Sequence, residues 1–303
     1  MSTVAPRPPF AAALAAGPLV LDGGLSNQLE AEGHDLGDAL WSARLLDEAP
    51  EAVVAAHLAY FRAGADVAIT ASYQASFEGF ARRGTGRRRA AGLIASSVAL
   101  AREAARRADV ARPLWVAGSV GPYGAVLADG SEYRGRYGLG VAELERFHRP
   151  RVAALAAAEP DVLALETVPD VDEAVALLRA VRGVGLPVWL SYAVAGGRTR
   201  AGQPLEEAFA VAAGVDQVVA VGVNCCAPEE VAEAVTVAAR VTGKPVVAYP
   251  NSGEAWGPDG WTGDTTFAPA RVGTWRAAGA RLIGGCCRVG PGAIGEVAGV
   301  LGR

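Results

Sequence analysis

Eight short apolar runs, separated by stretches with helical spacing, constrain the fold of this 303-residue chain more than any other feature. The runs are Leu19–Asp22, Val67–Thr70, Leu114–Gly118, Val162–Glu166, Val188–Tyr192, Val218–Asn224, Val246–Tyr249 and Arg281–Gly285. They show almost no alternation of polar and apolar residues, which is typical of parallel strands buried on both faces. Eight such strands alternating with helices predict a single (β/α)8 barrel of the TIM type, an α/β fold.

A doubly wound open sheet is the competing architecture. Such sheets usually have fewer strands, and many carry the motif G-x-G-x-x-G after the first one. The residues at the end of the first run here, LDGGLSNQ, do not fit that motif. We therefore predict one barrel domain over residues 18–303, preceded by an N-terminal extension of residues 1–17.

Composition and charge exclude several classes of protein. The net charge is −4, whereas a nucleic-acid-binding protein usually has a strong basic excess. No apolar run reaches the ~18 residues that span a bilayer, and the FAAALAA run near the N-terminus is too short for a typical signal peptide. We expect a cytoplasmic protein that acts on small molecules. The sequence does not indicate an oligomeric state. The basic cluster Arg82–Arg89 is interpreted as a solvated loop or helix end, with anion binding or a lid role as the alternative.

Polar residues follow the predicted strands at the end where barrel enzymes place their active sites. Asp22, Glu166 and Asn224 each close a run, and Tyr249 closes another. If the barrel is correct, these side chains and the nearby cysteines converge on one mouth.

The four cysteines form two adjacent pairs, Cys225-Cys226 and Cys286-Cys287, each after a predicted strand. Thiols stay reduced in the cytoplasm, so metal binding or catalysis is favoured over a disulfide framework. Three or four thiolates suit Zn²⁺, and three would leave one coordination position open, as in catalytic zinc sites. Both cysteines of one pair can bind one ion only if the backbone turns sharply, which Gly284 and Gly285 permit. Core packing and redox chemistry are the alternatives for these thiols.

Several segments together resemble the homocysteine S-methyltransferase family. They are DGGLSNQLE, ALWSARLL, ITASYQAS, GSVGPYGA, LALETVPD, VGVNCCAP, YPNSGE and IGGCCR. They occur in order over nearly the whole chain, and the combination of GVNC with GGCC is the most specific part. The chain is most similar to the members that use S-methylmethionine or S-adenosylmethionine, and the family's fold is also a (β/α)8 barrel.

The resemblance implies that Cys225, Cys286 and Cys287 hold a zinc ion, which leaves Cys226 as a small packing residue. Zinc would remove the proton from the thiol of homocysteine, because the thiolate is the reactive nucleophile. No histidine base is then required, and His34, His57 and His148 all fall away from the predicted strand ends.

The resemblance also implies contacts to both substrates. Asp22 and Glu166 would lie near the amino group of homocysteine, and backbone N–H groups around Gly23 and Gly24 would receive its carboxylate. Asn224 and the segment from Tyr249 to Asn251 would line the sulfur side of the pocket.

The methyl donor is a cation, which an aromatic face can attract, and Trp41 and Tyr73 are the candidates. Gln74 stands where betaine-using relatives carry an aromatic residue, which favours a sulfonium donor. The choice between S-methylmethionine and S-adenosylmethionine stays open. Two other functions also stay open: methyl transfer to another thiol or selenol such as selenocysteine, and a non-catalytic barrel with a structural metal.

Overall fold

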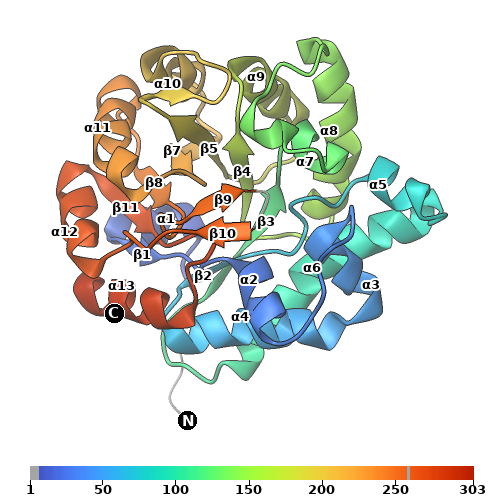
Figure 1. Ribbon diagram of the computed structural model, residues 1–303, viewed down its shortest axis with the longest axis horizontal. Helices are drawn as coiled ribbons and strands as arrows, with labels where there is room; N and C mark the ends of the chain where they lie inside the picture. The colour runs from blue at the N-terminus through green and yellow to red at the C-terminus, as the bar shows by residue number, and fades with distance from the viewer. Residues whose placement is uncertain (1–6, 258–259) are drawn as a thin grey trace.

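The computed structural model describes residues 7–257 and 260–303, and its strands form the predicted barrel (Figure 1). The barrel strands are β1 (Leu19–Val20), β2 (Val67–Ile69), β3 (Trp115–Val120), β4 (Val162–Val168), β5 (Val188–Ala195), β7 (Val218–Asn224), β8 (Val246–Tyr249) and β11 (Ala280–Ile283). They pair in the order β1-β11-β8-β7-β5-β4-β3-β2, and all these pairings are parallel. A parallel bridge between Leu21 and Val67 joins the two ends of this order. The (β/α)8 prediction is confirmed.

A ring of helices surrounds the strands in Figure 1. The outer helices are α4 (Pro50–Ala63), α6 (Arg87–Arg107), α8 (Val141–Ala156), α9 (Val171–Ala180), α10 (Leu205–Ala213), α11 (Val231–Thr242), α12 (Pro269–Ala278) and α13 (Pro291–Leu301). Shorter elements lie in the loops that leave the carboxyl ends of the strands. They are α2 (Leu25–Ala31), η1 (Trp41–Arg44), α3 (Leu45–Glu48), α5 (Phe77–Arg82), α7 (Tyr123–Leu127), η2 (Ser131–Tyr133), β6 (Arg198–Thr199), η3 (Pro228–Glu230), β9 (Ala255–Gly257) and β10 (Gly260–Thr262).

Apolar side chains pack on both faces of the barrel wall, which explains the unbroken apolar runs. In β3 all six residues are buried. Trp115 and Ala117 belong to the cluster inside the barrel, whereas Val116 and Val120 pack in the layer between strands and helices. Successive side chains of a strand point to opposite faces, so both faces must be apolar here.

A helix that the sequence analysis did not predict, α1 (Phe10–Ala16), covers the amino ends of the strands. Phe10 and Leu14 are buried in the same cluster as the inward side chains of the barrel. The rings of Phe10 and Trp189 lie 6.2 Å apart, and the indole N–H of Trp115 donates to the carbonyl oxygen of Pro8 at 3.1 Å. The apolar FAAALAA run therefore closes the bottom of the barrel. The division into an extension over residues 1–17 and a domain over 18–303 stays a prediction.

The Phe10→Ala variant is expected to lower the free energy of unfolding by about 3–5 kcal/mol, the usual cost of emptying a buried phenylalanine site. Phe10 is 2% exposed, and its ring fills the amino end of the barrel. Urea unfolding followed by circular dichroism measures the change. Ala12→Ser, at an exposed position of the same helix, is the control and should be nearly neutral. A cost below about 1 kcal/mol for Phe10→Ala would show that α1 contributes little to the core.

Candidate active site

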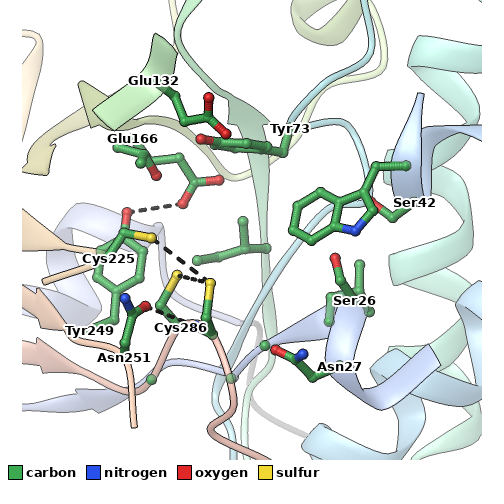
Figure 2. Close-up of a pocket in the computed structure, with 18 of the residues that line it drawn as sticks. Ser26, Asn27, Ser42, Tyr73, Glu132, Glu166, Cys225, Tyr249, Asn251 and Cys286 are labelled. Atoms are coloured by element: carbon green, nitrogen blue, oxygen red, sulfur yellow. Dashed lines mark hydrogen bonds between the residues drawn. The ribbon is translucent and has the colours of Figure 1, made fainter. Parts of the chain in front are cut away.

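A cavity of about 870 Å³ opens at the carboxyl ends of the barrel strands. Nine of the eleven predicted site residues line it: Gly23, Gly24, Trp41, Tyr73, Glu166, Cys225, Tyr249, Cys286 and Cys287. Figure 2 shows how side chains from distant segments face this common space. The two other predicted residues, Asp22 and Asn224, do not line the cavity.

Three thiols meet at one side of the cavity, and we call Cys225, Cys286 and Cys287 the thiol cluster. The Sγ atom of Cys287 lies 3.9 Å from that of Cys225 and 4.0 Å from that of Cys286 (Figure 2). All three sulfur atoms lie within 4.8 Å of one another. Sulfur ligands around a tetrahedral zinc ion, with Zn–S bonds of ~2.3 Å, are about 3.8 Å apart. The cluster therefore fits one soft metal ion with a fourth position left for another ligand.

The fourth thiol, that of Cys226, lies outside this cluster. Cys226 is 1% exposed, and its side chain belongs to the apolar layer between strands and helices. Burial raises the pKa of the Cys226 thiol, whereas hydrogen bonds from Cys286 and Cys287 lower the pKa of Cys225. The two adjacent cysteines of this loop therefore have opposite environments, one apolar and one that favours the thiolate.

The backbone at the thiol cluster departs from ordinary geometry. Cys225 has a φ of 52° and Arg288 has a φ of 66°, a left-handed region that non-glycine residues rarely adopt. Gly284 and Gly285, which we expected to permit a sharp turn, do not have positive φ angles. They provide space for close packing, because a Cβ atom on Gly284 would lie 2.6 Å from the carbonyl oxygen of Asp22. A side chain on Gly285 would meet Val289 in the same way.

Two buried carboxylates belong to the strand ends here: Glu166 lines the cavity, and Asp22 lies outside its lining, directly before Gly23. The carboxylate of Glu166 accepts hydrogen bonds from the hydroxyls of Ser119 and Tyr249, the latter at 3.0 Å. Burial raises the pKa of Glu166 to about 7 against these hydrogen bonds. Asp22 accepts from the N–H of Ile69 at 2.8 Å through Oδ2, while its buried Oδ1 has no hydrogen-bond partner in the described residues. Burial, and to a smaller extent Glu166, raise the pKa of Asp22. A cation bound beside these two groups would offset their desolvation.

Two predicted site residues, Asn224 and Gly24, use their polar groups in hydrogen bonds within the protein. Asn224 is fully buried, and its amide oxygen accepts from the N–H of Thr167 at 2.8 Å while its amide nitrogen donates to Thr167 Oγ1 at 2.7 Å. These bonds fix Thr167, which has a φ of 57° directly after Glu166. The N–H of Gly24 donates to the carbonyl oxygen of Val289 at 2.9 Å, so it is not directed at the cavity. The sequence motifs predict that these residues belong to the site, but they do not predict the hydrogen-bond partners of the Asn224 amide and the Gly24 N–H.

Two aromatic side chains form a further wall of the cavity. The rings of Trp41 and Tyr73 lie 6.2 Å apart at 70°, in an edge-to-face arrangement. Gln74 lines the same side, where its amide nitrogen donates to the carbonyl oxygen of Ala125 at 2.8 Å. The faces of two rings beside one cavity suit a positively charged ligand.

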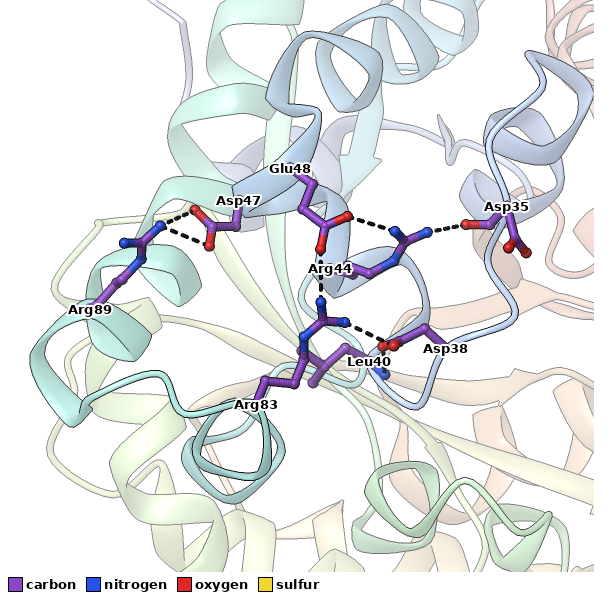
Figure 3. Close-up of polar contacts among 8 residues, drawn as sticks. All are labelled: Asp35, Asp38, Leu40, Arg44, Asp47, Glu48, Arg83 and Arg89. Atoms are coloured by element: carbon purple, nitrogen blue, oxygen red, sulfur yellow. Dashed lines mark hydrogen bonds and ion pairs between the residues drawn. The ribbon is translucent and has the colours of Figure 1, made fainter.

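Ion pairs surround the loop that carries Trp41, and they involve two arginines of the basic cluster seen in the sequence, Arg83 and Arg89 (Figure 3). The guanidinium of Arg83 contacts Asp38 and Glu48, each at 2.8 Å. Arg89 pairs with Asp47 of α3 at 2.7 Å. Partly exposed pairs of this kind contribute about 0–1 kcal/mol each. They join the end of α5 and the start of α6 to α3 and to the loop at Asp38, and they pair these two arginines with protein carboxylates.

Sequence analysis missed five charged residues of the cavity: Glu30, Asp38, Glu254, Glu132 and Arg200. The last two matter most here. Glu132 lies in the η2 turn and Arg200 follows β6, so neither is at the end of a predicted strand. Tyr133 directly follows Glu132, and its hydroxyl is 3.3 Å from the Sγ atom of Cys225. The only available signal was the Gly-rich loop with its aromatic residues.

The histidines lie away from the cavity, and none of the three is among its lining residues in the described part of the chain. His57 is buried in α4, where desolvation lowers its pKa to about 4. His148 is buried in α8 and contacts Glu173 at 2.9 Å.

Searched over residues 7–257 and 260–303, the helices include none with the length and apolar character needed to cross a membrane.

Comparisons with known proteins place this arrangement in a family. A model of the homocysteine S-methyltransferase family matches residues 19–301. Homocysteine S-methyltransferase 4 from Zea mays is 46% identical over 94% of this chain and 89% of the relative. Selenocysteine Se-methyltransferase from Brassica oleracea is 40% identical over 91% of this chain and 86% of that protein. The metallated form of the homocysteine methyltransferase MmuM from Escherichia coli has a TM-score of 0.87 and 43% identity, covering 96% of this chain and 99% of that one. The resemblance seen in the sequence is confirmed, and the chain belongs to the homocysteine S-methyltransferase family.

Proposed function

We propose that this enzyme transfers a methyl group from a sulfonium donor to the thiol of homocysteine and so forms methionine. The observation that carries the proposal is the thiol cluster, which lies in one cavity with the buried carboxylate of Glu166. Family membership and the relatives of similar length support the same reaction. The cytoplasm is its proposed location.

The thiol cluster would hold zinc through Cys225, Cys286 and Cys287, because three soft sulfur atoms favour zinc over magnesium or calcium. When bound, zinc supplies a Lewis acid that lowers the pKa of a thiol beside it, and thiolates are far better nucleophiles than thiols. The carboxylates of Asp22 and Glu166 would receive the ammonium group of homocysteine. The Gly23 N–H stays our predicted donor to its carboxylate.

The other wall of the cavity would orient the donor. The rings of Trp41 and Tyr73 would attract the sulfonium charge and hold the methyl carbon toward the acceptor sulfur. Such alignment contributes much of the rate in a bimolecular transfer. The charges of the cavity favour a cation too, because five carboxylates and one cationic side chain line it in the described residues: Glu30, Asp38, Glu132, Glu166, Glu254 and Arg200.

A selenol acceptor such as selenocysteine is the second candidate, because the selenocysteine methyltransferase from Brassica oleracea covers nearly the whole chain. Both acceptors carry the same amino-acid head group, so Asp22 and Glu166 would serve either of them. The two differ in how readily the acceptor ionises.

Methionine should form when the zinc-loaded enzyme is incubated with homocysteine and either S-methylmethionine or S-adenosylmethionine. Removing the metal with a chelator should abolish turnover, and added zinc should restore it. Chromatography of the amino acids measures the product, and selenocysteine in place of homocysteine tests the second candidate. Full activity of the metal-free protein would contradict the proposed mechanism. Methylation of selenocysteine without methylation of homocysteine would contradict the proposed acceptor.

A further inference from the structure

One carboxylate of the cavity differs from the others in having a free buried oxygen. The Oε2 atom of Glu132 is buried and has no hydrogen-bond partner in the described residues. The four other cavity carboxylates all have partners: Asn27 for Glu30, Arg83 for Asp38, Tyr249 for Glu166 and Arg288 for Glu254. Figure 2 shows the Glu132 side chain above Tyr73, on the side of the cavity away from Asn27. A buried carboxylate oxygen without a donor is costly unless a ligand supplies one.

The loop around Glu132 is fixed by specific contacts. The carboxylate of Asp129 accepts from the N–H of Ser131 at 2.9 Å, and the N–H of Gly135 donates to the Ser131 carbonyl oxygen at 2.9 Å. A Cβ atom on Gly124 would lie 2.5 Å from the backbone nitrogen of Glu132, so only glycine allows this close approach. The position of the Glu132 carboxylate therefore follows from the fold of the loop.

Arg200 supplies the opposite charge in the same region. It is the single cationic side chain among the described residues that line the cavity, and its buried Nε atom has no hydrogen-bond partner among them. Its guanidinium lies 5.4 Å from the centre of the Tyr133 ring, and Tyr133 directly follows Glu132 in the chain. No ion pair joins Arg200 to Glu132 in the described structure, although both face one cavity. Each of these two charged groups keeps a buried polar atom without a partner in the described residues.

We propose that Glu132 and Arg200, here called the donor pair, bind the ammonium and carboxylate groups of the methyl donor. An α-amino acid carries these two charges on one carbon, so it fits between an acid and a base that do not pair. The acceptor head group has its own carboxylates, Asp22 and Glu166, and a cavity of about 870 Å³ is large enough for two small amino acids. This inference rests on the proposed function and narrows its donor to sulfonium compounds with an amino-acid head group.

Donor analogues that lack one charge test the two contacts separately. S-Methylmethionine carries both charges, 3-(dimethylsulfonio)propanoate lacks the ammonium group, and trimethylsulfonium lacks both. The KM of S-methylmethionine and the competitive inhibition constants of the two analogues would be measured for the zinc-loaded wild type, Glu132→Gln and Arg200→Met. Zinc content and the KM of homocysteine would be measured for each variant. Arg198→Met, in the same hairpin but outside the cavity lining, is the matched control.

Glu132→Gln should raise the KM of S-methylmethionine by about 10- to 100-fold, the usual effect of losing a hydrogen bond to a charged group. It should change the inhibition constant of 3-(dimethylsulfonio)propanoate by less than about 3-fold. Arg200→Met should weaken both compounds, and neither variant should alter the inhibition by trimethylsulfonium or the KM of homocysteine.

Equal weakening of all three sulfonium compounds by Glu132→Gln would overturn the assignment. A rise in the KM of homocysteine alone would overturn it as well, because the donor pair would then bind the acceptor. Absence of methionine from every donor in the wild type would instead overturn the proposed function, and this inference with it. The analogues that lack the ammonium group serve as an internal check that the variant cavity is intact.

Discussion

The Cys286→Ala variant is expected to lose its zinc and to lose at least about 100-fold in kcat/KM. Replacing even an outer partner of a metal ligand typically costs 10- to 100-fold, so removing a ligand should cost about that much or more. The three sulfur atoms lie within 4.8 Å of one another, so two remaining thiols would leave half of a tetrahedral site to water. Elemental analysis of the purified protein and methionine formation measure the two losses.

Cys226→Ala is the matched control, because Cys226 is adjacent to a cluster residue but its side chain lies in the apolar core. It should retain zinc and keep its activity within about 3-fold, since a small buried side chain is replaced by another. If Cys226→Ala empties the site while Cys225→Ala keeps the metal, the assignment of ligands within this pair is wrong.

Glu166→Gln should raise the KM of homocysteine by about 10- to 100-fold while zinc stays bound, because a neutral amide replaces the charged partner of the ammonium group. The pH dependence gives a second readout. The pKa of Glu166 is raised to about 7, so its carboxyl is charged above that pH and neutral below it. The KM of homocysteine in the wild type should therefore rise as the pH falls through about 7, and the variant should lose this component.

Initial rates at several homocysteine concentrations between pH 5.5 and 8.5, a window of roughly 1.5 units to each side of the raised pKa, separate KM from kcat. Glu145→Gln on the outer surface of α8, where Glu145 pairs with Arg149, is a suitable control and should behave as the wild type. Loss of zinc from Glu166→Gln would mean that the carboxylate is itself a ligand, and the proposed role would be wrong.

The strands could be predicted from the sequence because burial on both faces leaves long apolar runs. The ends of β7 and β8 match the predictions, whereas β1 ends at Val20 and not at Asp22. An apolar run indicates burial but does not show where the strand ends. Leu21 is buried, yet it pairs with Val67 only through an isolated bridge and is not part of β1. The α1 helix was missed because FAAALAA has no distinguishing pattern, and its role depends on a barrel opening that only the folded chain creates.

The meeting of the two cysteine pairs could be predicted because both follow strands directly, whereas the choice of Cys225, Cys286 and Cys287 came from the family resemblance. Glu132 and Arg200 were not predictable in this way, since each lies well inside a loop whose course depends on tertiary contacts. Gly24 lines the cavity, but its N–H donates to the carbonyl oxygen of Val289, a partner that is far away in the sequence.

The two hydrogen bonds between Asn224 and Thr167 have a consequence for how the two halves of the site communicate. Asn224 precedes Cys225, and Thr167 follows Glu166, so the amide joins the sulfur-bearing loop to the acidic strand end. A backbone shift of Cys225 on metal binding would be passed through these bonds to the carboxylate beside Thr167. Metal occupancy and affinity for the amino acid would then be linked, and each would change the other by the same factor.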